Sequence, residues 1–169
     1  VLRRATQLRL ISDAPLGALL SGGIDSSAVV ALMADLGQVP DTFSIGFDDA
    51  SYNELEHART VARHVGANHH EEILVCDPDH ALAAVEASLD EPLADVSLIP
   101  THMVSAMARR HVTVALSGDG GDEVFAGYDW YRAAALADAY GRVPAPARRA
   151  ADAVLRRIPD RPRKRGLVN

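Results

Sequence analysis

Leu20 to Ser27 read L-S-G-G-I-D-S-S, a glycine turn between two apolar runs. The run before the turn, Leu16–Leu20, predicts a buried strand, and the run after it, Ala28–Met33, predicts a buried helix. Glycine lets a backbone approach an anion closely, and the first N–H groups of a helix are unpaired and carry a favourable dipole. The three serines of the turn add hydroxyl donors. The stretch therefore predicts a phosphate-binding loop between a strand and a helix.

The spacing of this loop narrows the class of nucleotide site. A Walker A loop requires G-x-x-x-x-G-K-[ST], and no lysine follows here. The dinucleotide signature G-x-G-x-x-G is also absent. An S-G-G-x-D-S loop directly after a first strand resembles the pyrophosphate loop of the N-type ATP pyrophosphatases, which cleave ATP between the α and β phosphates. The alternative is an ordinary glycine-rich turn without a ligand.

Composition sets the broad class of protein. The chain has 169 residues, of which 48% are hydrophobic and 24% charged, as expected of one globular domain with a sizeable core. No apolar run is long enough to span a bilayer, and the first residues lack the pattern of a signal peptide. We therefore expect a cytoplasmic protein without a membrane partner. Cys76 is the single cysteine, so no intrachain disulfide is expected.

Charge is distributed unevenly along the chain. The formal net charge is −6, yet Arg148–Asn169 carry seven arginines and one lysine against Asp152 and Asp160. A basic tail can bind nucleic acid, but no aromatic residue interleaves with these arginines to stack on bases. We interpret the tail as a solvated helix and linker and do not expect a nucleic-acid partner. The seven histidines lack metal-ligand spacing, and we expect them to be structural or exposed.

The remaining apolar patterns alternate between strand and helix. Alternation of this kind predicts βαβ units and a doubly wound parallel sheet with helices on both faces, an α/β fold. The loops after the first and last strands then share one rim, where such sheets bind ligands. Predicted strands cover 42–47, 71–75 and 112–116; predicted helices begin at Asn53, contain Leu82, Val85 and Leu89, and cover 99–110, 128–140 and 146–158.

Ser117 to Glu123 read S-G-D-G-G-D-E and form a second glycine-rich loop directly after a predicted strand. Three acids within five residues repel one another unless a cation lies between them. Mg²⁺ takes one or two carboxylates together with phosphate oxygens, so a metal–nucleotide site explains the pattern. A solvated acidic turn is the alternative, and the spacing excludes a calcium loop of the D-x-D-x-D-G type.

Taken in order, the motifs resemble those of the asparagine synthase domain. They are L-S-G-G-I-D-S-S, F-S-I-G-F, H-H-E, L-D-E-P-L-A-D-V-S-L-I-P and L-S-G-D-G-G-D-E-V-F-A-G-Y, and they extend from about Leu2 to Tyr131. The resemblance implies an adenine nucleotide alpha hydrolase-like fold. It implies that residues 1–142 are part of an ATP pyrophosphatase-type synthetase domain. Residues 143–169 would be a basic helix and tail that begin the remainder.

The resemblance also implies a reaction, in which ATP and Mg²⁺ adenylate the side-chain carboxylate of aspartate and ammonia then displaces AMP. The resemblance implies that Asp119 is catalytic. Many members of the family carry glutamate at this position. Asp25 and Asp122 would bind Mg²⁺, and Asp95 and Ser97 are weaker candidates for the amino-acid substrate. The ATP-binding residues would be Leu20, Ser21, Gly22, Gly23, Asp25, Ser26, Ile45, Ser117 and Gly118.

Several features of the family are expected elsewhere. Its enzymes take ammonia from an N-terminal glutaminase domain, and a downstream segment supplies a phosphate-binding lysine. Neither is present here, and Lys164, the single lysine, lies in the basic tail. We therefore expect an incomplete synthetase domain, with a homodimer as an open option. Another acyl-adenylating amidotransferase, a β-lactam synthetase relative and a non-catalytic nucleotide-binding fragment are the alternatives.

Overall fold

A computed structural model describes residues 1–47, 54–74, 78–91, 93, 95 and 97–148. The chain divides into two compact units, Val1–Asp119 and Gly120–Val168. No helix in the described part is both long enough and apolar enough to cross a membrane.

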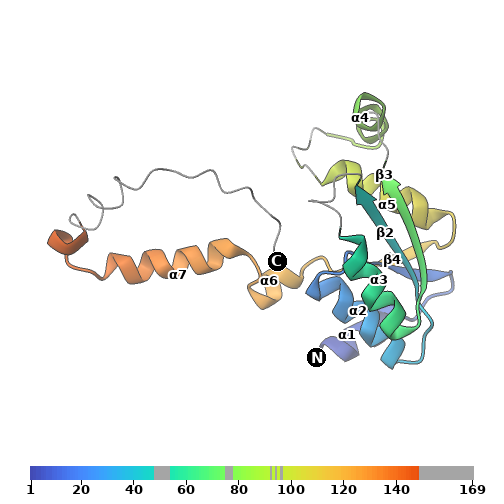
Figure 1. Cartoon of the computed structure of the whole chain (residues 1–169), viewed down its shortest axis with the longest axis horizontal. Coiled ribbons are helices and arrows are strands. Elements are labelled where there is room, and N and C mark those ends of the chain that lie inside the picture. The colour runs from blue at the N-terminus through green and yellow to red at the C-terminus, as the bar shows by residue number, and fades with distance from the viewer. Residues whose placement is uncertain (48–53, 75–77, 92, 94, 96, 149–169) are drawn as a thin grey trace. The chain divides into compact units, whose positions relative to one another are not determined.

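The first unit contains one parallel sheet with the strand order β3-β2-β1-β4. Pairing runs outward from β1 to β2 and β3, and the chain then returns to pair β4 with the other edge of β1. The reversal places a topological switch point between β1 and β4, where sheets of this kind bind ligands. The elements, drawn in Figure 1, are α1 (Leu2–Arg9), β1 (Leu16–Leu19), α2 (Ile24–Asp35), β2 (Asp41–Phe47), α3 (Leu55–Val65), β3 (Asn68–Leu74), α4 (Pro78–Glu86), α5 (Leu98–Arg109) and β4 (Val114–Leu116).

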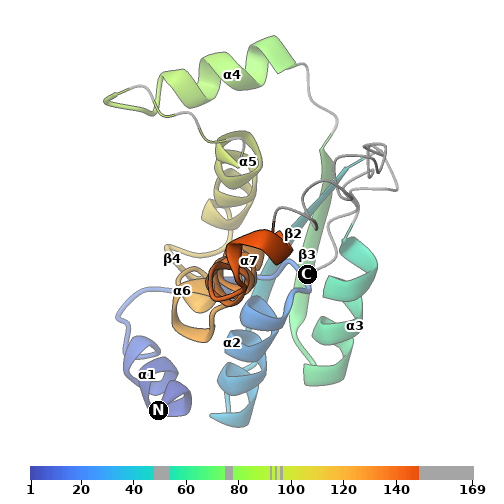
Figure 2. The ribbon, with the colours of Figure 1, turned by 90° about the vertical axis from the view of Figure 1, so that its left-hand side faces the viewer.

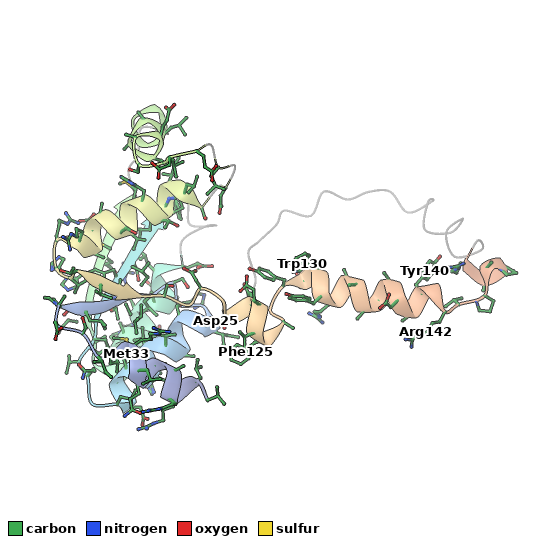
Figure 3. All side chains as sticks on the ribbon, turned by 180° about the vertical axis from the view of Figure 1, so that it is seen from behind. Asp25, Met33, Phe125, Trp130, Tyr140 and Arg142 are labelled. Carbon is green, nitrogen blue, oxygen red and sulfur yellow. The ribbon has the colours of Figure 1, made fainter. Side chains whose placement is uncertain are left out.

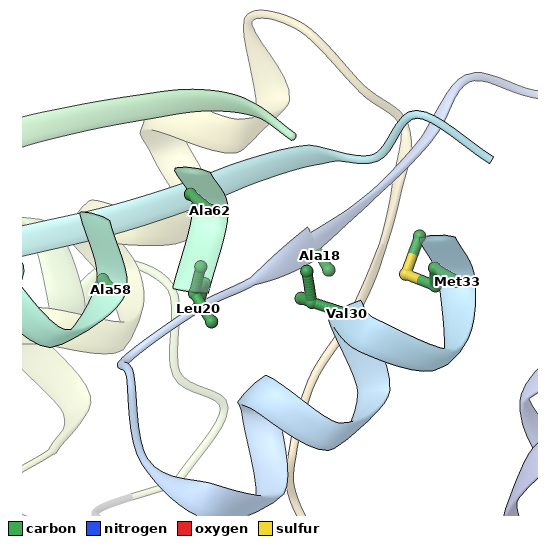
Figure 4. Packing of buried hydrophobic residues seen from close by; sticks show 6 residues of the cluster. All are labelled: Ala18, Leu20, Val30, Met33, Ala58 and Ala62. Carbon is green, nitrogen blue, oxygen red and sulfur yellow. The ribbon is translucent and has the colours of Figure 1, made fainter. Parts of the chain in front are cut away.

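Each face of the sheet has its own hydrophobic cluster. One cluster joins β1 to α2 and α3 and is shown in Figure 4; it consists of Ala18, Leu20, Val30, Met33, Ala58 and Ala62. The other joins β2 to α5 and the turn after it; it consists of Phe43, Met107, Ala108 and Val112. Side chains on a strand alternate between faces, so Leu19 packs against the second cluster while its neighbours Ala18 and Leu20 belong to the first. The elements on both faces can be followed in Figure 2, and the predicted doubly wound α/β sheet is confirmed.

Most predicted elements are present with small shifts of their ends. The helix predicted to begin at Asn53 is present as α3, and its apolar face is buried at Leu55, Ala58 and Ala62. Gly66 ends this helix with φ 70°, the left-handed conformation that favours glycine at a helix C-terminus. β3 begins at Asn68, three residues before the predicted start, because the ladder with β2 pairs Asn68 with Asp41.

Two predictions about elements are wrong. The final strand was predicted over 112–116, but β4 begins at Val114, which is 40% exposed. Among the strands that the structure describes, β4 pairs with β1 alone and lies at the edge of the sheet. Leu89 was expected in a helix with Val85, but α4 ends at Glu86. Val75, Cys76 and residues 149–158 of the predicted final helix lie outside the described residues.

The second unit contains α6 (Gly121–Phe125) and α7 (Asp129–Gly141). The helix predicted over 128–140 is confirmed as α7, whereas α6 was not predicted. Ala126 ends α6 with φ 56°, an unusual conformation for a residue other than glycine. Neither helix has a buried residue, and Trp130 and Tyr140 project from α7 in Figure 3. The predicted boundary between residues 142 and 143 differs from the division at Gly120 and stays a prediction.

Candidate nucleotide site

The first loop turns from β1 into α2 within the four residues 20–23. Gly22 has φ +88°, which side chains rarely adopt, and a Cβ there would lie 2.6 Å from both the Ala58 nitrogen and the His57 Cβ. Glycine is therefore required at this position by conformation and by space. The loop lies directly against the start of α3, which holds it close to the sheet.

Ser21 and Ser26 tie this loop to the first turn of α2. The Ser21 N–H donates to the Ser26 Oγ at 3.3 Å, and the two hydroxyl oxygens are 3.0 Å apart. The Gly23 N–H donates to the Ser21 Oγ at 3.2 Å, and the Ser26 hydroxyl donates to the Gly23 carbonyl at 3.3 Å. Both hydroxyls predicted to meet phosphate therefore lie together beside the helix start.

The N-terminus of α2 supplies the electrostatic setting for an anion. Ile24, Asp25 and Ser26 begin the helix, and N–H groups in a first turn have no carbonyl of the same helix to bind. The helix dipole adds partial positive charge at this end. Asp25, which Figure 3 labels, places a carboxylate in the same turn. This end of α2 therefore presents N–H groups of the kind that bind phosphate and a carboxylate of the kind that binds a cation.

The second loop reaches the same place from β4. A Cβ on Gly118 would lie 2.7 Å from the Ser26 nitrogen and 3.1 Å from the Asp25 Cβ, so the loop backbone rests against the start of α2. The Ser117 hydroxyl donates to the Asp119 Oδ2 at 2.9 Å, and the Asp119 N–H approaches the Ser117 Oγ at 3.4 Å. Residues 117–119 of the second loop, which belong to the first unit, therefore lie against the start of α2 beside the first loop.

The donor set suits Mg²⁺ that arrives with phosphates. Among the residues the structure describes, no group of three or more His, Cys, Asp or Glu side chains could hold a metal ion alone. Mg²⁺ does not need such a group, since one or two carboxylates and phosphate oxygens complete its shell. Asp25 places a carboxylate, a hard oxygen donor, at the helix start, and its part in a metal site stays a prediction. Asp122 lies in α6, in the second unit, and its part in a metal site stays a prediction.

Residues next to Asp122 make a separate contact in the second unit. The Tyr128 hydroxyl donates to the Glu123 Oε1 at 2.6 Å. This hydrogen bond lowers the pKa of Glu123 and raises the pKa of Tyr128 to about 12. Glu123 is therefore held in its ionised form by its own neighbour.

Residues 1–168 match the family model for asparagine synthase. The chain belongs to the asparagine synthase family. It is 36% identical over 170 residues to a Mycobacterium tuberculosis (strain ATCC 25618 / H37Rv) protein named provisionally as a glutamine-hydrolysing asparagine synthetase, with 100% of this chain and 26% of the relative covered. The asparagine synthetase [glutamine-hydrolyzing] 1 of Bacillus subtilis (strain 168) is 36% identical over 143 residues, which cover 83% of this chain and 22% of the relative.

A third relative, from Methanocaldococcus jannaschii, carries the same kind of provisional name. It is 44% identical over 127 residues, which cover 73% of this chain and 24% of the relative. The chain thus spans about a quarter of the length of these curated relatives. Membership of the family confirms the resemblance found in the motifs.

Three further predicted residues lie apart from the two loops along the chain. Ile45, expected at the adenine, is half-buried on β2 and packs against the cluster under α5. Asp95 accepts the Ser97 N–H at 2.8 Å, and the Ser97 N–H and hydroxyl lower the pKa of Asp95. That contact forms a local turn immediately before α5. The roles of Ile45, Asp95 and Ser97 in binding stay predictions.

Sequence reasoning missed Ser44 on β2. This residue is 4% exposed, and its hydroxyl donates to the Leu20 carbonyl at the start of the first loop. One signal was available in T-F-S-I-G-F, where Thr42 and Ser44 are two residues apart and share a face of the sheet. Polar side chains on a buried strand need hydrogen-bond partners, so their partners can be sought among the neighbouring loops.

Proposed function

We propose that this chain is the ATP-binding part of an asparagine synthetase, which adenylates the side-chain carboxylate of aspartate for amidation by ammonia. The observation that carries the proposal is the close approach of Gly118 to Asp25 and Ser26 at the start of α2. It brings a hydroxyl-rich loop and an acidic loop together where phosphates and a cation can be bound. Membership of the asparagine synthase family supports the choice of reaction.

The phosphates of ATP are assigned to the first loop and the helix start. Ser21 and Ser26 would donate hydroxyl hydrogen bonds, and the glycines at 22 and 23 would let backbone N–H groups approach the phosphates. Ser117 and Gly118 would contact the nucleotide from the second loop, with Leu20 and Ile45 nearer its base. Asp25 and Asp122 would hold Mg²⁺, which neutralises charge on the phosphates.

In the adenylation step an aspartate carboxylate oxygen would bond to the α-phosphorus of ATP while the bond to the β-phosphate breaks and pyrophosphate leaves, so one anion approaches another. Positive backbone dipoles and donors at the start of α2 offset that repulsion. Asp119 is assigned to the step that forms the adenylate. The acyl-adenylate must then be kept from water until ammonia arrives. Relatives named as glutamine-hydrolysing suggest glutamine as the source of that ammonia.

The test is calorimetric binding of Mg-ATP to the wild-type chain and to two aspartate variants on α2. Asp25→Ala removes the carboxylate of the first turn and should weaken binding at least several-fold. Asp35→Ala is the matched control, because Asp35 ends the same helix and pairs with Arg3 at 2.9 Å. Circular dichroism confirms that each variant is folded.

Binding that is equal in the wild type and in Asp25→Ala would remove Asp25 from the site. A folded wild-type chain that binds neither Mg-ATP nor AMP would contradict the proposal as a whole.

A further inference from the structure

We infer that Ser44 is a positioning residue of the nucleotide site, which fixes the orientation of the Leu20–Ser21 peptide where the phosphate loop begins. Its hydroxyl donates to the Leu20 carbonyl from the neighbouring strand. Ser44 is 4% exposed and Leu20 is 1% exposed, so water does not replace this contact easily. For the identity of the ligand, the inference rests on the proposed function.

The Leu20–Ser21 peptide is held from both sides. Its carbonyl accepts the Ser44 hydroxyl from β2, and its N–H donates to the Ser26 Oγ of α2 at 3.3 Å. One residue earlier, the Leu20 N–H donates to the Phe43 carbonyl at 2.9 Å. A peptide unit is planar, so its carbonyl and N–H turn together, and loss of the contact at the carbonyl lets the unit tilt about the contact that remains at the N–H.

The consequence reaches the groups proposed to bind phosphate. The Ser26 Oγ that accepts the Ser21 N–H is also 3.0 Å from the Ser21 Oγ. A change in the tilt of the peptide therefore alters the placement of both hydroxyls. Ser44 does not itself belong to the loop, and it acts through Leu20.

Thr42 offers a matched control on the same strand. Its side chain is fully buried on the same face, and its Oγ1 lies 2.9 Å from the His69 Nδ1, away from the phosphate loop. Thr42→Val and Ser44→Ala each remove one buried hydroxyl from β2. A role limited to packing or to strand stability predicts the same consequences for both variants.

The first measurement is hydrogen exchange in the unliganded chain, read in peptides that cover residues 20–24. Exchange there should be at least several-fold faster in Ser44→Ala than in the wild type and unchanged in Thr42→Val. Ser44→Thr keeps the hydroxyl and should restore wild-type exchange. If Ser44→Ala does not fold, Ser44→Cys supplies a weaker donor on a slightly larger side chain and should show an intermediate rate.

The second measurement is calorimetric binding of Mg-ATP and of Mg-pyrophosphate. Ser44→Ala should weaken both about tenfold, in line with the loss of one hydrogen bond that orders the site, whereas Thr42→Val should bind as the wild type does. Equal loop exchange in Ser44→Ala and Thr42→Val would overturn the inference, as would equal affinities. A wild-type chain that fails to bind either ligand would contradict the proposed function, and the exchange data would still decide the role of Ser44.

Discussion

Two constraints require glycine at position 22: the backbone conformation and the lack of space for a Cβ. Comparison with Gly37 distinguishes their contributions. Gly22 and Gly37 both have φ +88°, but a Cβ on Gly37 meets nothing within 4 Å, whereas a Cβ on Gly22 would collide with the start of α3. The cost of the left-handed conformation is therefore common to both sites. Of these two positions, only Gly22 in the phosphate loop would add the free-energy cost of a steric collision.

We predict that Gly37→Ala lowers the free energy of unfolding by about 1–2 kcal/mol, the cost of a left-handed alanine. Gly22→Ala should lower it by about 1–3 kcal/mol more, because the loop or α3 must move. Urea unfolding of both variants measures the difference. Equal losses of unfolding free energy in the two variants would show that the loop and α3 can move apart to accept a Cβ at little cost.

The strands β2 and β3 are joined by partly buried hydrogen bonds between side chains as well as by the backbone ladder. The His69 ring on β3 bonds Thr42 of β2, and its side chain is 13% exposed. Burial lowers the pKa of His69, and the nearby Glu71 carboxylate, 3.6 Å from the His69 Nε2, opposes that shift only in part. His69 is therefore neutral in the folded protein at a pH where an exposed histidine begins to take up a proton.

A histidine whose pKa is lowered on folding binds its proton more readily in the unfolded chain. Stability is then lost as pH falls below about 6.5, the ordinary histidine value, and the loss ends below the lowered pKa of the folded state. We predict that the melting temperature falls between pH 7.5 and pH 5.5. The fall should be smaller in His69→Gln.

His64→Gln, at an exposed position of α3, is the matched control for the replacement of a histidine by glutamine. Protonation of Glu71 does not contribute to the pH dependence of the melting temperature in this range. Its pKa is lowered by Arg59, so its contribution is lost only as pH falls below about 4.5, outside the range measured. An unchanged pH profile in His69→Gln would assign the dependence to another group.

The elements that could be predicted from sequence are those whose local patterns agree with their burial. An apolar run, two glycines and a second apolar run in the sequence correspond to β1, the glycine loop and α2. The helix α3 has a single apolar face. β3 begins in the polar stretch N-H-H-E-E, where pairing with β2 rather than side-chain alternation defines the strand. Ser44 was missed for a related reason, because its partner is a carbonyl 24 positions earlier in the chain.

Both hydrophobic clusters belong to the first of the two units. Their buried members lie between Ala18 and Val112, and neither α6 nor α7 has a buried residue. The sheet and its helices thus carry the apolar burial found in the described residues. The stability of the fold should depend little on the second unit.

We predict that a chain ending at Asp119 keeps the far-ultraviolet spectrum of a folded α/β sheet and unfolds in one cooperative transition. Its melting temperature should lie within a few degrees of that of the full chain, since a loss of 1 kcal/mol shifts the midpoint by about 4–8 °C in a domain of this size. Scanning calorimetry of the two chains makes the comparison. A large fall in the midpoint would mean that residues after Asp119 contribute to the core.

Chemistry and binding can be separated in the complete enzyme by replacing Ser26 and Asp119. In a full-length synthetase that contains this chain, Ser26 is assigned to phosphates that are present from the start, whereas Asp119 is assigned to the formation of the adenylate. Ser26→Ala should therefore raise the KM for ATP by an amount equivalent to about 1.5–3 kcal/mol, the value of one hydrogen bond to a charged group. Asp119→Ala should lower kcat and kcat/KM together by about 10²-fold with a smaller change in KM, because its contribution is realised in the transition state.

Steady-state release of pyrophosphate with ammonia as the nitrogen donor measures both variants without any need for glutamine. Asp119 is exposed on its loop, and its Oδ2 accepts the Ser117 hydroxyl, so its replacement should not disturb either hydrophobic cluster. A change in KM alone for Asp119→Ala would make this residue a ligand of the ground state. The catalytic assignment would then move to another group of the acidic loop, with Asp122 the first to be tested.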